Sequence, residues 1–181
     1  MPQIPPELTP PPAAPDQGSD ALFTAVYARL KAMASRQRAR ASGATLNTTA
    51  LVHELYLKLS ATGELRFESP AQFFDYAAQG MRHILVDRAR ERLALKRGGG
   101  ALMEDTAAAA AAADSTAEHT LQLDIALQQL ARRDARAARL VELHYFAGLS
   151  FPEIAALTGV ATRTLNRDWR YARAFLYEQV G

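Results

Sequence analysis

The sequence predicts an all-α protein made of two small helical domains joined by a flexible linker. Apolar residues recur at three- and four-residue steps in several segments, and no stretch alternates between apolar and polar residues as a strand does. A chain of 181 residues with 49% hydrophobic content can bury one sizeable core or two small ones. We expect a first domain at 20–97, a linker at 98–118 and a second domain at 119–181.

The first 19 residues contain seven prolines among small and polar residues. Proline cannot occupy a helix interior, so we expect 1–19 to be a disordered tail. Structure is predicted to begin near Ser19 or Asp20, because either side chain can cap a helix. The apolar residues that follow at helical spacing predict a first helix, and they are Leu22, Phe23, Val26, Tyr27, Leu30 and Met33.

Two more periodic segments complete the first domain. The second helix is predicted from Leu51, Val52, Leu55, Tyr56 and Leu59. The third is long, with more than about six turns, and it ends at the glycines 98–100, which disfavour helix. Its apolar face consists of Phe73, Phe74, Ala77, Met81, Ile84, Leu85 and Leu93.

The linker at 98–118 includes an unbroken alanine run from Ala107 to Ala113. Alanine favours helix, but a run without an apolar stripe has nothing to bury, so we expect a spacer that is only transiently helical. Periodicity resumes near His119. One helix is predicted from Leu123, Leu127 and Leu130, and the next from Leu140, Val141, His144 and Tyr145.

Basic residues gather in two stripes although the net charge is only +2. Six Arg or Lys and two acids lie from Arg82 to Arg97, and four Arg and one acid lie from Arg163 to Arg173. Between them, 98–120 holds four acids and no Lys or Arg. This pattern favours two modules that each meet a polyanion.

The most specific stretch is GLSFPEIAALTGVATRTLNRDWRYARAFL. Ser150 and Glu153 have the spacing of a capping box, and Gly159 permits a tight turn whose corner Val160 can fill. A second helix then follows, in which Ala161 stands where a capping residue is expected, and Thr162 is the alternative cap. Its inward side carries Leu165, Trp169 and Ala172, and its outward side carries Thr162, Arg163, Thr164, Asn166, Arg167 and Arg170.

This order is that of a helix-turn-helix, whose second helix enters the DNA major groove. There its arginines reach guanine edges or phosphates. The alternative is a core helix pair whose arginines only face solvent.

Together with this motif, LVHELYLKL and FFDYAAQGMRHILVDRARERLALKRGG make the chain resemble bacterial sigma factors of the extracytoplasmic-function (ECF) group. The resemblance covers about 20–97 and 120–178. It implies that the partners are promoter DNA and the clamp and flap regions of core RNA polymerase. It also implies that the terminal helix reads the minus-thirty-five promoter element, and that the second helix docks on the clamp through Leu51, Val52, Glu54, Leu55 and Lys58.

By the same resemblance, the third helix holds the melted strand of the minus-ten element. Phe73, Phe74 and Tyr76 offer faces on which unpaired bases can stack. The predicted backbone-tracking stripe consists of Arg82, His83, Arg88 and Arg90, and Asp87 is expected to pair with and order a neighbouring arginine. For the two phenylalanines, core packing is the alternative, and for Asp87 it is a plain surface ion pair.

One departure from the group concerns the residues before Leu51. These are usually acidic in the group and help to bind the positively charged clamp, but here they are Asn47, Thr48, Thr49 and Ala50. A phosphate on Thr48 or Thr49 would restore negative charge at a helix N-terminus. We hypothesise that a serine/threonine kinase licenses polymerase binding. The alternative is that both threonines are ordinary helix-capping residues, and an anti-sigma partner also stays open.

Other functions are disfavoured by what the sequence lacks. It has no cysteine, its four histidines lack ligand spacing, and no phosphate loop or nucleophile elbow is visible. We therefore expect no metal, no cofactor and no enzymatic activity, and a cytoplasmic protein. The competing function is a stand-alone operator-binding regulator, which would not need the second basic stripe with its aromatics.

Overall fold

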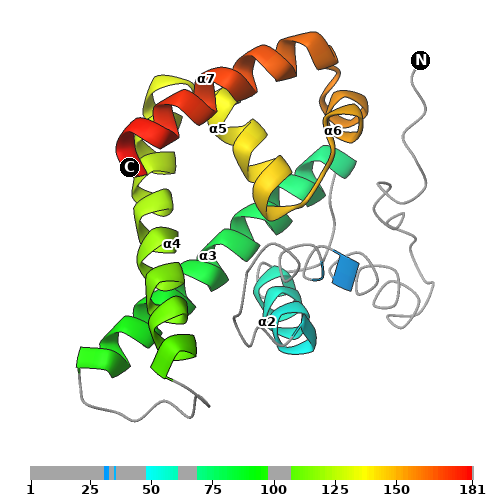
Figure 1. The fold of residues 1–181 in the computed structure, drawn as a ribbon. Coiled ribbons are helices and arrows are strands. Elements are labelled where there is room, and N and C mark those ends of the chain that lie inside the picture. The colour runs from blue at the N-terminus through cyan, green and yellow to red at the C-terminus, as the bar shows by residue number, and fades with distance from the viewer. Residues whose placement is uncertain (1–30, 33–34, 36–47, 61–68, 98–106, 181) are drawn as a thin grey trace, which may run out of the picture.

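The structure, a computed structural model, describes residues 31–32, 35, 48–60, 69–97 and 107–180. Every element in these ranges is a helix (Figure 1), which confirms the all-α class. The elements are α2 (Thr48–Ser60), α3 (Pro70–Arg97), α4 (Ala107–Arg133), α5 (Ala135–Val141), the π-helical η2 (Glu142–Phe146), α6 (Phe151–Thr158) and α7 (Thr162–Val180). The proline-rich tail and almost all of the predicted first helix lie outside the described residues. No described helix combines the length and apolar character that crossing a membrane requires.

Helix α2 packs against α3 through the apolar face that its sequence predicts. Leu51, Val52 and Leu55 have no exposed surface. A Cβ added at Gly80 of α3 would lie 2.6 Å from the Leu55 Cδ1, so glycine allows the two helices to approach closely here. Ser69 begins α3, since its hydroxyl accepts a hydrogen bond from the Gln72 backbone N–H at 3.2 Å.

Helix α4 begins earlier than the sequence periodicity indicates. Residues 107–118, which the sequence analysis assigns to a linker, form its first turns. The alanine run is tied to α3, because the Arg92 guanidinium donates to the Ala110 carbonyl at 3.0 Å and to the Asp114 carboxylate at 2.8 Å. Ala117 is also buried. Tertiary contacts thus stabilise this part of α4, although its sequence has no amphipathic pattern. The predicted domain boundaries at 97/98 and 118/119 stay a prediction.

The remaining helices build an arch above α3 (Figure 1). Asp134 caps α5 by accepting from the Ala137 N–H at 2.9 Å, and η2 continues directly from α5. Helix α7 then returns over the top, and it contacts both α4 and α5. Buried side chains from α2 through α7 belong to one hydrophobic cluster, so α3 is packed on both its N-terminal and its C-terminal neighbours in the chain.

The predicted capping box and glycine turn are confirmed. The Glu153 carboxylate accepts from the Ser150 N–H at 2.6 Å, and the Ser150 hydroxyl accepts from the Glu153 N–H at 3.4 Å. Gly159 ends α6 with φ of +73°, a left-handed conformation that favours glycine. Helix α6 and the start of α7 are therefore fixed locally by three residues.

Candidate nucleic-acid interface

The inner side of α7 is the one the sequence predicts. Leu165 and Ala172 are buried, and Trp169 makes an edge-to-face contact with His144 at 4.8 Å between ring centroids. Thr162 is the first helical residue, and the Ala161 carbonyl accepts from the N–H groups of Thr164 and Leu165. Ala161 thus occupies the cap position without a capping side chain.

The outer side of α7 carries the predicted polar and basic residues. Most of them are exposed, and only Thr164 is half-buried. Asn166 donates to the Thr162 carbonyl at 2.9 Å, which keeps its amide along the helix. The exposed set is Thr162, Arg163, Asn166, Arg167 and Arg170. A capped helix pair therefore presents a basic face from the first half of α7.

Asp168 of α7 is buried and paired, which the sequence did not predict. The Asp168 side chain is 6% exposed, and it accepts two hydrogen bonds from the Arg136 guanidinium of α5 at 2.8 and 3.1 Å. This paired geometry fixes the angle between α5 and α7. The two residues are 32 positions apart, so no local pattern could have indicated the pair.

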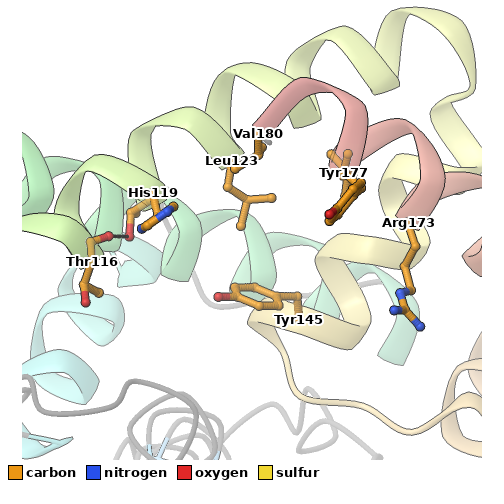
Figure 2. Close-up of a pocket in the computed structure, with 9 residues that line it drawn as sticks. Thr116, His119, Leu123, Tyr145, Arg173, Tyr177 and Val180 are labelled. Atoms are coloured by element: carbon orange, nitrogen blue, oxygen red, sulfur yellow. Dashed lines mark hydrogen bonds between the residues drawn. The ribbon is translucent and has the colours of Figure 1, made fainter. Parts of the chain in front are cut away.

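The second half of α7 packs against α4. A pocket of about 340 Å³ lies between them, with Tyr145 of η2 along one side (Figure 2). Leu123 of α4 and Tyr177 and Val180 of α7 face into it, while Arg173 lies at its edge. Contact with α4 covers one side of this half, while Arg173 remains exposed.

Helix α3 separates the predicted minus-ten residues onto different sides. Phe73 and Phe74 are buried, with ring centroids 5.1 Å apart at 79°, so in this structure they pack in the core, as their alternative interpretation holds. Tyr76 is 49% exposed, and His83 and Arg90 are exposed as well. These three residues recur every seven positions and lie on one side of the helix.

The other predicted charged residues of α3, Arg82, Asp87 and Arg88, are paired within the molecule. Arg88 donates to Glu54 of α2 at 3.0 Å. Asp87 pairs with Arg90 at 3.3 Å, as the sequence predicts, and also with Lys58 at 3.4 Å. The Arg82 side chain is only 11% exposed, and its two partners are acids of α4 and η2.

The predicted polymerase-binding residues of α2 divide into two groups. Leu51, Val52 and Leu55 are core residues, whereas Glu54 and Lys58 keep 37% and 41% of their side-chain surface. His53 and Leu57, which the sequence analysis missed, are also exposed, Leu57 by 53%. Thr48 begins the helix, and its first turn contains no acid. The side chains of Thr48 and Thr49 lie outside what the structure describes.

At the far end of α3, Asp114 of α4 accepts from two cations. Its carboxylate lies 2.8 Å from the Arg92 Nε and 3.3 Å from the Lys96 Nζ. Burial raises the pKa of Asp114, but the hydrogen bonds and charges of Lys96 and Arg92 outweigh it and hold that pKa below its usual value. The contact therefore stabilises the ionised form of Asp114.

Replacing Asp114 with asparagine is expected to lower the free energy of unfolding at pH 7, and this difference from wild type should shrink as the carboxylate becomes protonated in acid. A carboxyl whose pKa is lowered on folding stabilises the fold above its unfolded pKa, about 3.9, and loses that effect as the pH falls through the folded value. Urea denaturation of both proteins from pH 7 to pH 3 measures this. A difference that stayed constant over the range would contradict it.

Comparison with known proteins identifies the family. Residues 14–181 match the family model described as ECF sigma factor. No curated protein and no solved structure matches. The family acts in transcription initiation directed to promoters, with RNA polymerase and promoter DNA as partners. The capped helix-turn-helix and the basic α3 agree with this function, and the chain belongs to the ECF sigma factor family.

Proposed function

We propose that this sigma factor reads the minus-thirty-five element with the first half of α7 and holds the melted minus-ten strand on the exposed side of α3. The observation that carries the proposal is the outward face of α7. There Arg163, Arg167 and Arg170 are exposed on α7, which follows the capped helix α6 and its left-handed Gly159. A recognition helix needs this arrangement to place its first turns against base edges.

On α3, the proposed contact for the melted strand is the stripe of Tyr76, His83, Arg90 and Arg97. All four are exposed and follow one another at seven-residue intervals, over a length of about 30 Å. Tyr76 supplies a stacking surface and the two arginines supply charge for the phosphates. In this proposal Phe73 and Phe74 do not contact DNA, because they are buried in the core beneath α3.

For the polymerase clamp, we propose the exposed side of α2. Leu51, Val52 and Leu55 hold the helix on α3, so Glu54 and Lys58 contact the clamp together with His53 and Leu57. The kinase hypothesis rests on the start of this helix at Thr48 and on its acid-free first turn. Phosphate at Thr48 or Thr49 would interact favourably with the helix dipole and with a basic clamp.

The test is co-elution with core RNA polymerase, followed by transcription from promoter fragments. Wild type is compared with Thr48→Glu/Thr49→Glu and with Ser115→Glu/Gln122→Glu, which adds the same charge to exposed positions of α4. Binding that improves only in the threonine variant supports the kinase step. Equal binding by all three proteins would support the sigma function but contradict the kinase step, and Thr48 and Thr49 would then be ordinary helix-capping residues. Duplex binding without any binding to polymerase would favour the operator-binding regulator.

A further inference from the structure

The second half of α7 borders a pocket that the proposed function does not use. The pocket lies between α7 and α4, its volume is about 340 Å³, and the π-helical η2 borders one of its sides (Figure 2). Small-molecule sites in proteins have volumes of about 300–1,000 Å³. π-Helical turns are rare and are frequently found at functional sites. The size of the pocket and the element beside it are therefore those of a ligand site.

Most of the lining of this pocket is apolar or aromatic. Leu123, Leu176 and Val180 line it, and Leu123 and Val180 point into it in Figure 2. Tyr145 and Tyr177 flank these side chains and are 38% and 77% exposed. A flat ring placed against the two tyrosines would remove apolar surface from water on both sides of the contact. The lining thus favours an aromatic ligand.

The charge at the pocket comes from Arg173 at its edge. No carboxylate is among the described residues that line the pocket, and no ion pair joins Arg173 to any residue within the described ranges. The hydroxyls of Thr116 and Thr120 donate to backbone carbonyls of α4 at 2.9 and 2.8 Å, so these donors are already used. The His119 Nδ1 lies 2.8 Å from the Ser115 carbonyl. A guanidinium without an acid beside it favours an anionic group on the ligand.

We propose that this pocket binds a small aromatic carboxylic acid, with its ring against Tyr145 and Tyr177 and its carboxylate on the Arg173 guanidinium. The planar guanidinium can donate two parallel hydrogen bonds to one carboxylate, which fixes the orientation of the ring. This inference goes beyond the proposed function, because Arg163, Arg167 and Arg170 do not line the pocket.

The test titrates the full chain with indole-3-acetate and with indole-3-ethanol, which has the same ring but no charge, and follows binding by calorimetry. A ligand of this size in an open pocket is expected to have a dissociation constant of about 1 mM. We expect indole-3-ethanol to bind about tenfold more weakly, since it lacks the charged hydrogen bonds. Equal affinities for the two ligands, or no binding of indole-3-acetate at about ten times the expected constant, would overturn the proposal.

The variant Arg173→Gln locates the site. It should lower the affinity for indole-3-acetate by about tenfold and leave that for indole-3-ethanol unchanged. Its control is Arg132→Gln, which makes the same change in net charge at an exposed arginine outside the pocket, and this variant should bind like wild type. An equal loss in both variants would show attraction by general positive charge and would contradict the proposed site.

A second variant, Tyr177→Ala, tests the aromatic wall. Tyr177 is the most exposed of the large apolar side chains, so its truncation should leave the fold intact. We expect weaker binding of both indole ligands, because both stack through the ring. Unchanged affinities would place the ligand elsewhere and refute the site. These titrations contain neither polymerase nor DNA, so their failure would leave the proposed function untouched.

Discussion

Replacing Arg163 with alanine is expected to reduce transcription from a promoter with an intact minus-thirty-five element by about 5- to 150-fold. Arg163 is exposed in the first turn of α7, the part of a recognition helix that contacts base edges. Loss of one base contact of an arginine costs about 1–3 kcal/mol, and that range converts to this change in affinity. Run-off transcription with the reconstituted holoenzyme measures it.

The matched control for Arg163 is Arg132→Ala. Arg132 is an exposed arginine in the last turn of α4, outside both proposed DNA faces, and its removal changes the net charge equally. We expect little effect on transcription from this variant. A loss of similar size in both proteins would mean that α7 contributes only general positive charge, and the assignment of α7 to base reading would then be wrong.

Replacing Leu127 with alanine is expected to lower the free energy of unfolding by about 2–5 kcal/mol, the range for a leucine removed from a well-packed core. Leu127 has no exposed surface and belongs to the cluster that extends from α2 to α7. The cavity left behind would lie in α4, which contacts both α3 and α7. Urea denaturation followed by far-ultraviolet circular dichroism measures the change.

Ile125→Ala provides the comparison on the same helix. Ile125 is 57% exposed, so its truncation should change the free energy of unfolding by no more than about 0.5 kcal/mol. If the two variants were equally stable, Leu127 would not lie in a packed core between α4 and its neighbours.

Local signals predicted the helix-turn-helix well. The hydroxyl of Ser150, the carboxylate of Glu153 and the freedom of Gly159 act within a few residues of their own positions, so the sequence contains all the information that they need. The spacing of Leu165 and Ala172 likewise identified the buried side of α7. The outward arginines lie on the opposite side of the helix, so the same spacing predicted that these arginines are exposed.

Two features of the candidate site could not be predicted in this way. The alanine run at 107–113 has no apolar stripe, and it is attached to α3 by the Arg92 guanidinium, which donates to the Ala110 carbonyl. In the sequence Arg82 resembles its basic neighbours. In the structure it is enclosed because it forms ion pairs with Asp124 and Glu142. Both depend on pairs distant in the chain.

The sequence by itself determined the helical class, the capped terminal motif, the family resemblance and the two basic stripes, because each depends on the spacing of nearby residues. Only the tertiary structure decided which members of those stripes face solvent. It placed Tyr76, His83 and Arg90 outside, and it placed Phe73, Phe74 and Arg82 inside. The reason is physical: helical periodicity fixes which residues share a side, whereas the docking of α4 and η2 on α3 decides which side is covered.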